Sequence, residues 1–354
     1  MLQKLLLSGI AMSLINNAFS QDSAKAYSLA VTGSTDLYYR YDIAKTKANN
    51  LTSFTNSHNS FELGMASVKV DYQASKVQMV VDIGVGKRAQ EFSYNDEGIL
   101  SSIKQLYISY APASNVKFTA GSWATHVGYE LVDPNLNRNY SMSYMFTNGP
   151  FFHTGLKGEV SFGVNGFMVG LANPTDYKYV PDGQMNSKFL LAQYSFTPGD
   201  IFKAYVNYVG GKGVDTTKSD QFDLVLTSKL SKKFNLAYNS TLNRTTFYLG
   251  DKLYDKTKSW WGSALYVNFD PSKTLGLTLR QEYFSDQNHL KVFSGNNEGG
   301  GILATTFSAN VRTGSLTFIP EIRFDKASEP IFSNADGGSR KWATNILFAA
   351  IYQF

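Results

Sequence analysis

Two pairs of oppositely charged residues are the clearest chemical feature of this 354-residue chain. Arg280 and Glu282 form one pair, and Glu321 and Arg323 form the other. Residues two positions apart project from the same face of an extended strand, so each pair would lie on one polar surface. Such groups could orient a dipolar solute in a transverse field, or they could simply neutralise each other along the strand. Arg40 occupies a similar position in an earlier alternating segment.

A second polar feature is the long segment from Gly128 to Gly149. Amide, hydroxyl and carboxylate groups of this kind can replace water around a polar solute that passes them. The alternative is an ordinary solvated surface loop. The residues of interest in this segment are Glu130, Asp133, Asn135, Asn137, Arg138, Asn139, Tyr140, Ser141 and Ser143.

Catalytic chemistry has little support in the sequence. The chain has no His-Glu-x-x-His motif and no Gly-x-Ser-x-Gly nucleophile motif. Among its four histidines, His126 and His153 could in principle share a metal ion, but no acidic cluster lies beside them in the sequence. We therefore expect no catalytic residue, no metal and no cofactor.

The segments that carry these residues alternate in polarity at every second position, which is typical of strands rather than helices. In the last of them, Ile346, Phe348, Ala350, Tyr352 and Phe354 fall on one side of an extended strand. We identify sixteen such segments, at 27–41, 61–72, 76–86, 103–112, 116–127, 150–162, 164–172, 187–196, 201–210, 221–230, 233–244, 259–269, 274–284, 302–312, 315–325 and 342–354.

The connections between these segments are alternately short turns and long polar stretches. Strands can cross lipid only in a sheet without edges, because unpaired backbone groups are costly there. The pattern therefore predicts an all-β fold, a transmembrane antiparallel β-barrel of about sixteen strands with long external loops and short periplasmic turns. We expect a bulge between Met65 and Val68, where the polarity changes phase, and an irregularity at Pro320, which cannot donate a ladder hydrogen bond.

The composition agrees with a barrel. After the first twenty residues no apolar run is long enough for a spanning helix, and the mean hydropathy of −0.22 is low because lipid-facing and lumen-facing residues average out. The 22 Tyr, 25 Phe and 4 Trp suit aromatic girdles at the membrane interfaces. The net charge is only +5 and the basic residues are scattered, which gives nucleic-acid binding little support.

The N-terminus predicts a signal peptide. Lys4 precedes a mostly apolar stretch at 5–15, and Ala18, Phe19 and Ser20 fit a cleavage site. An uncleaved helix is the alternative, although the stretch is shorter than the roughly 20 residues that a membrane span requires. We expect cleavage after Ser20, which leaves one barrel domain at 21–354 in the outer membrane of a Gram-negative cell.

Three stretches in the middle of the chain resemble a known family, the OmpL-like putative β-barrel porins of Gram-negative outer membranes. They are GSWATHVGYE at 121–130, DPNLNRNYSMS at 133–143 and GPFFHTG at 149–155. The resemblance extends over nearly the whole mature chain. It implies a water-filled channel for passive diffusion of small polar solutes such as ions or sugars.

The same resemblance implies roles for individual parts of the chain. In general porins the third external loop enters the lumen, so 128–149 is the expected constriction. Tyr352 and Phe354 are the expected signal to the barrel-assembly machinery, and lipid and further copies in a homotrimer are expected partners. A transporter for selected substrates or hydrophobic compounds is the alternative, and a barrel enzyme such as an outer-membrane lipase is a weaker one.

Overall fold

The computed structural model describes residues 27–354 except 184–186, 215–216, 250–251, 254–256 and 297. The predicted signal peptide and cleavage site therefore lie outside the described residues. Sixteen long antiparallel strands form a closed barrel, as the alternating segments predict. They are β1 (Tyr27–Asp42), β2 (Ser60–Ala74), β3 (Val77–Val85), β4 (Ile103–Ala113), β5 (Val116–Ala124), β6 (Phe152–Phe162), β7 (Asn165–Ala172), β8 (Phe189–Phe196), β9 (Phe202–Lys212), β10 (Thr217–Lys229), β11 (Phe234–Leu249), β13 (Lys258–Phe269), β14 (Leu275–Asp286), β15 (Gly300–Thr313), β16 (Leu316–Ala327) and β19 (Trp342–Gln353).

The barrel closes between its first and last strands. The β1–β19 ladder runs from the Ser34–Gln353 pair to the Asp42–Asn345 pair. Gly33 and Phe354 then exchange two backbone hydrogen bonds of 3.0 Å. A Cβ atom on Gly33 would lie 2.6 Å from the Phe354 ring, so glycine permits this close approach. The closed ladder leaves no strand edge exposed to lipid.

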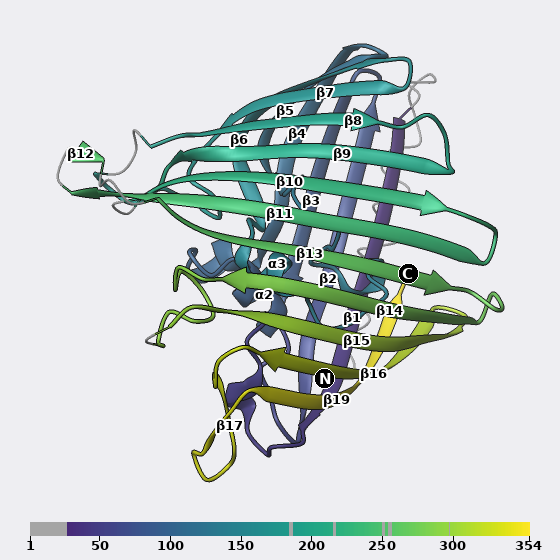
Figure 1. Cartoon of the computed structure of the whole chain (residues 1–354). Helices are drawn as coiled ribbons and strands as arrows, with labels where there is room; N and C mark the ends of the chain where they lie inside the picture. The colour runs from purple at the N-terminus through teal and green to yellow at the C-terminus, as the bar shows by residue number, and fades with distance from the viewer. Residues whose placement is uncertain (1–26, 184–186, 215–216, 250–251, 254–256, 297) are drawn as a thin grey trace, which may run out of the picture.

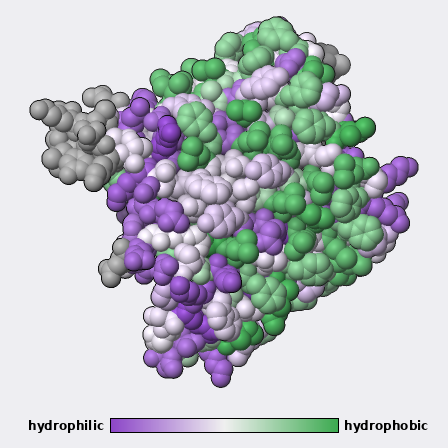
Figure 2. Space-filling view, in the orientation of Figure 1, coloured by the Kyte–Doolittle hydropathy of each residue, from purple (hydrophilic) through white to green (hydrophobic). Residues whose placement is uncertain are grey.

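Alternation along each strand separates an apolar outer face from a polar inner one. On β19, Ile346 and Phe348 are about half exposed, whereas Leu347 and Ala349 are buried inside. Figure 2 shows the result as a broad apolar band between the hydrophilic long-loop end and a hydrophilic edge at the short-turn end. The two ends are easiest to identify in Figure 1, where β12 (Lys252–Leu253) and β17 (Phe332–Ser333) mark the long-loop end.

The two expected irregularities both occur in the strands, with some differences in detail. The β1–β2 register shifts where Gly64 and Met65 lie opposite Asp36, so the bulge comes just before the predicted position. At Pro320 the pairing with β15 stops and then resumes in the same register, while the pairing with β19 continues. Proline thus interrupts one ladder without causing a bulge, because only its missing N–H is affected.

Two external connections are shorter than predicted, because β10 begins four residues earlier than expected and β11 extends five residues further. The extra residues are mostly polar, and their ladders continue beyond the apolar band. A short hairpin outside the barrel pairs β17 with β18 (Ser339–Arg340).

The remaining elements lie in the external loops. They are α2 (Lys87–Phe92) and η2 (Gly98–Ser102) in loop 2, η3 (Pro134–Leu136) and α3 (Tyr144–Asn148) in loop 3, and η1 (Lys47–Asn49) in loop 1. We number these loops in chain order, so that loop 1 is 43–59, loop 2 is 86–102, loop 3 is 125–151 and loop 4 is 173–188. Among the described residues, no helix has the length and apolar character needed to cross a bilayer.

Candidate functional site in the barrel lumen

Loop 3 folds into the barrel and lies against the inner wall. Its residues Tyr140, Met142 and Tyr144 are fully buried, although they belong to a connection between strands. The loop runs along β14, β16 and β1, and its backbone makes most of the contacts to these strands. A loop of this length can be buried only if its peptide groups find partners, and the charged residues of the wall supply them.

Two wall carboxylates each bind two successive backbone amides of loop 3. Glu321 accepts hydrogen bonds from the amides of Tyr140 and Ser141 at 2.9 and 3.2 Å. Glu282 accepts from the amides of Tyr144 and Met145, both at 2.9 Å. The second contact lies at the N-terminus of α3, where free amides favour a negative charge.

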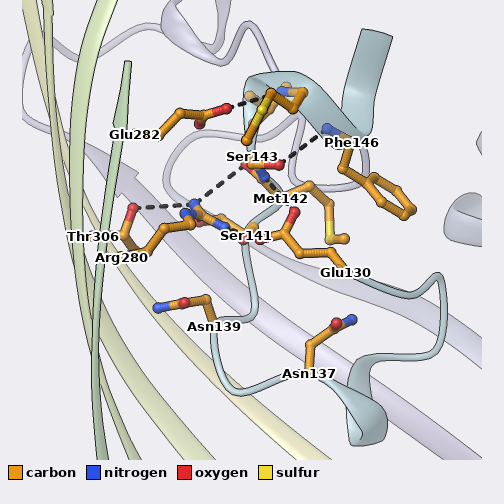
Figure 3. Close-up of polar contacts among 12 residues, drawn as sticks. Glu130, Asn137, Asn139, Ser141, Met142, Ser143, Phe146, Arg280, Glu282 and Thr306 are labelled. Atoms are coloured by element: carbon orange, nitrogen blue, oxygen red, sulfur yellow. Dashed lines mark hydrogen bonds and ion pairs between the residues drawn. The ribbon is translucent and has the colours of Figure 1, made fainter. Parts of the chain in front are cut away.

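Two wall arginines bind the carbonyl groups between these amides, and Figure 3 shows one of them, Arg280, beside Ser141 and Met142. Arg280 donates to the carbonyl oxygens of Ser141 and Met142 and forms an ion pair with Glu130 of the same loop. Arg323 donates to the Met142 carbonyl at 2.7 Å and pairs with Asp325. Along loop 3, a pair of amides is followed by carbonyl groups and then by a second pair of amides. The wall places a carboxylate against each pair of amides and the two guanidinium groups against the carbonyls between them.

The other part of loop 3 is held near the short-turn end. Arg138 forms a two-pronged ion pair with Asp270 in the β13–β14 turn, and this contact lowers the pKa of Asp270. Asn139 donates to the Ser308 hydroxyl at 2.6 Å. Further contacts join Asp133 to Lys104, Asn135 to Gln353, and the Tyr140 hydroxyl to Asp36.

Loops 1 and 2 also enter the barrel mouth, which the sequence pattern did not predict. Arg88 of α2 is fully buried between the rings of Phe54 and Tyr140, with its guanidinium carbon 4.8 and 4.7 Å from their centroids. It also donates to the carbonyl oxygens of Val132 and Tyr140. A hydrophobic cluster surrounds these contacts, made of Phe54, Phe92, Val132, Met142, Phe146, Phe151 and Phe152.

The five predicted site residues of the barrel wall are all covered by loops. Arg280, Glu282, Glu321 and Arg323 face the lumen as expected, but they lie beneath loop 3 and are at most 3% exposed. Neither pair neutralises itself along its strand. Arg40 is also buried, and it holds the Ser57 carbonyl of loop 1 and Asp42. These contacts favour an anchoring role for the five residues over direct contact with a solute.

Within loop 3, the predicted residues anchor the wall contacts or shape the loop itself. Asn137 bonds to the backbone of Leu131 and Asp133, and Ser143 caps α3 by accepting from the Phe146 amide. The residues that form contacts with the wall are Glu130, Asp133, Asn135, Arg138, Asn139, Tyr140 and Ser141.

Space remains on two sides of loop 3. One cavity of about 340 Å³ lies between Asp133, Asn135 and Leu136 and the strands β1 to β4. The other space lies on the opposite wall, along β10 and β11. At the long-loop end a vestibule of about 330 Å³ is lined by residues that include Asn148, Gln221 and Asn243. Beside it a second, small pocket of about 10 Å³ lies between loop 3 and the wall at Gln221, Asp223, Asn239 and Thr241. There the Asp223 carboxylate accepts a hydrogen bond of 3.0 Å from the Gly128 amide, so loop 3 contacts both walls.

The two histidines beside loop 3 lie close together, with their ring centroids 5.3 Å apart. The Nε2 atom of His126 is bonded to the Tyr208 carbonyl, and that of His153 to the Thr125 hydroxyl. Burial lowers the pKa of His126 to about 4. In the part of the chain that the structure describes, no group of three or more His, Asp or Glu residues is arranged to hold a metal.

Asp176 of loop 4 joins three external loops at the rim of the vestibule. Its carboxylate accepts from the amides of Phe151 and Phe152 at 2.7 and 3.0 Å and from the Tyr94 hydroxyl at 3.0 Å. The side chain is only 2% exposed, and this burial raises its pKa from 3.8 to about 6, although its hydrogen bonds and Lys178 oppose the shift.

Asp176 is expected to make the loop contacts depend on pH. The pKa of Asp176 is raised in the folded state, so its protonated side chain stabilises the docked loops relative to the open ones. This stabilisation is fully present below about pH 3.8 and is lost as the pH rises through about 6. After correction for intrinsic rates, the Phe151 and Phe152 amides should therefore exchange about tenfold more slowly near pH 5 than near pH 7.5. Asp176→Asn should remove this difference. Asp182→Asn, which changes an exposed residue of the same loop, should retain it; an unchanged pH dependence in Asp176→Asn would contradict the assignment.

Solved structures of several bacterial proteins share this fold. The anion-selective porin from Comamonas acidovorans aligns with a TM-score of 0.62 at 10% identity, covering 93% of this chain and 100% of that one. OmpT of Vibrio cholerae, in its trimer form, gives 0.61 at 9% identity with the same coverage. The outer-membrane channel DcaP of Acinetobacter baumannii gives 0.59 at 10% identity, with 94% and 99% covered.

At the level of sequence, no curated protein matches the chain. Residues 28–354, however, match the family described as putative beta-barrel porin-2, OmpL-like. This range includes every strand of the barrel except the first residue of β1. The resemblance seen in the middle of the sequence is therefore confirmed, and the chain belongs to the OmpL-like family of outer-membrane β-barrel porins.

Proposed function

We propose that this porin lets small polar solutes diffuse passively across the outer membrane, with loop 3 setting its narrowest point. The observation that supports the proposal is the position of the loop. One side of it is bound to charged residues of β14 and β16, and the other side approaches β10 and β11, where a pocket of only about 10 Å³ remains between loop and wall. We infer that this pocket marks the narrow passage of the channel. A solute that crosses the barrel beside loop 3 would pass Gly128, Gly149 and the facing wall.

Ion selectivity should be weak. The four wall charges nearest to loop 3, two of each sign, are buried, and each is bonded to that loop. They therefore contribute little net field to the space on the other side of the loop. The comparison with an anion-selective porin supports a shared fold and leaves selectivity to be measured.

The cellular context is also part of the proposal. The signal peptide at 1–20 would direct export, and Tyr352 and Phe354 on the closing strand would be read by the barrel-assembly machinery. Outer-membrane lipid would contact the apolar band. Further copies would form a homotrimer, as the name of one OmpT structure records for that protein.

Planar-bilayer recording tests the channel directly. The purified protein should produce stable current steps in KCl, with a reversal potential close to zero under a salt gradient. A protein that inserts into the bilayer without conducting would contradict the channel proposal.

The position of loop 3 can be tested with cysteines, because the chain contains none. The Asn139 amide lies 2.6 Å from the Ser308 hydroxyl, so the Asn139→Cys/Ser308→Cys pair is expected to form a disulfide on oxidation. The conductance should remain that of the unmodified channel, because the bond fixes the loop where it already lies. The control pair Asn139→Cys/Thr241→Cys places the second cysteine on β11 across the lumen and should stay reduced. Crosslinking of the control pair, or of neither pair, would argue against this position.

A further inference from the structure

The lumen has two chemically different halves. Loop 3 covers the charged half, where Arg280, Glu282, Glu321 and Arg323 are at most 3% exposed. The other half, along β9 to β11, carries mainly amide and hydroxyl side chains, which surround the buried carboxylate of Asp223. Several of these line the vestibule, among them Ser219, Gln221, Asn243 and Thr245. A solute that enters the barrel therefore meets the neutral half.

The neutral side chains form one connected hydrogen-bond network. Asn243 donates to the Ser219 hydroxyl at 2.8 Å and accepts from Thr245 at 2.9 Å. Gln221 donates to Thr241 at 3.1 Å and accepts a long hydrogen bond of 3.5 Å from Asn243, which joins the two groups. These bonds fix the orientation of the amides, and each amide has two donors and two acceptor sites in total. Such groups can exchange hydrogen bonds with the hydroxyls of a solute as water does.

Aromatic and apolar surfaces lie beside the amides. Tyr94, Phe189 and Phe247 also line the vestibule. The volume of about 330 Å³ is at the lower end of the roughly 300–1,000 Å³ found for ligand pockets. Sugars present both hydroxyl groups and apolar C–H faces, so a monosaccharide or disaccharide suits this combination in size and chemistry.

The charges near this path are largely compensated. Asp176 accepts three hydrogen bonds and is 2% exposed. Asp223, in the narrow passage, accepts from Gly128, Asn207 and Asn239. Glu130 is paired with Arg280. Lys291, whose side chain is exposed, also lines the vestibule and is the charge that an anion would meet at its mouth. Elsewhere along the path a charged solute would lose hydration without gaining a counter-charge, whereas a neutral polyol would not bear that cost.

We propose that the vestibule is a binding site for uncharged polyhydroxylated solutes of monosaccharide to disaccharide size, and that this porin is selective for them. The inference rests on the proposed diffusion function and deepens it. Gln221 and Asn243 are the specificity-determining residues, because they belong to the amide network just above the narrow passage.

Liposome swelling with solutes of matched size tests the selectivity. Glucose should enter several-fold faster than gluconate or glucosamine. In planar bilayers, glucose should reduce the KCl current in a saturable manner. Gln221→Ala should raise the half-blocking glucose concentration about two- to tenfold, the value of one hydrogen bond. The matched control Gln281→Ala changes an amide on the outer face of β14 and should leave that concentration unchanged.

The outcomes separate this proposal from the diffusion function. A channel that conducts KCl but passes gluconate or glucosamine as fast as glucose would overturn the solute class and leave the porin role intact. Equal effects of Gln221→Ala and Gln281→Ala would overturn the assignment of the site. Absence of both KCl conductance and swelling would overturn the diffusion function itself.

Discussion

Replacing residues 138–143 by a glycine-serine linker of equal length is expected to raise the single-channel conductance several-fold. The replacement removes the Arg138–Asp270 ion pair, the Asn139–Ser308 hydrogen bond and the buried Tyr140 side chain. A flexible linker also loses more conformational entropy when it is held against the wall. The equilibrium should therefore shift towards a loop that leaves the wall, which widens the passage.

The same change should alter selectivity as well as conductance. Wall charges that loop 3 now covers would become hydrated, so the KCl reversal potential should move away from zero. A shortened external hairpin, with residues 335–337 removed between β17 and β18, serves as control and should conduct like the unmodified channel. If the linker variant kept the original conductance, loop 3 could not be the constriction.

Strand parity explains why so much of the wall could be predicted. Along β14 and β16, apolar residues such as Leu277, Leu279 and Ile322 mark the outward positions, so the alternation alone predicts an inner-surface position for Arg280, Glu282, Glu321 and Arg323. The short turns were equally readable, since a turn must interrupt the alternation. The sequence does not fix how far a strand continues outside the membrane. Polar residues are compatible there with a strand or with a loop, and β10 and β11 are longer than predicted for this reason.

The partners of those charges could not be predicted from the sequence. Glu282 binds the backbone amides of Tyr144 and Met145, and every residue except proline offers such an amide. The identity of the residues in a loop therefore does not reveal which backbone amides a distant carboxylate will bind. The pairing of Arg280 with Glu282 looked plausible for this reason, although Arg280 pairs with Glu130, 150 residues away.

Loops 1 and 2 show a second limit. Arg88 follows directly on an apolar strand and looks like an ordinary surface residue, because loops have no periodicity to assign a face. Its burial depends on Phe54 from loop 1 and Tyr140 from loop 3, which meet only in the folded barrel. The sequence predicts membrane girdles from the aromatic content as a whole, and it gives no signal that aromatic residues of these loops pack inside the barrel mouth.

Arg280→Ala is expected to release the upper part of loop 3 while the barrel remains closed. The variant leaves the Ser141 carbonyl buried without its donor and the buried Glu130 carboxylate without its ion-pair partner, while the Met142 carbonyl keeps only its bond to Arg323. Removing one partner of a buried ion pair typically costs about 3–5 kcal/mol. The amides of Tyr144 and Met145 should then exchange at least about a hundredfold faster, because docking of the loop protects them. Bilayer recordings should show rapid fluctuations of the current through the open channel, because the released loop moves within the lumen.

A double-mutant cycle with Glu130→Ala distinguishes charge compensation from simple loss of contact. If the buried, unpaired Glu130 carboxylate causes most of the damage, Arg280→Ala/Glu130→Ala should restore part of the protection lost in Arg280→Ala. Arg280→Lys keeps the charge but loses the planar fork, so it should protect the loop less well than arginine. Arg244→Ala, at an exposed position on β11, controls for loss of positive charge and should leave exchange unchanged. Equal exchange rates in Arg280→Ala and Arg244→Ala would mean that the buried arginine does not hold the loop, and that the wall carboxylates alone are sufficient.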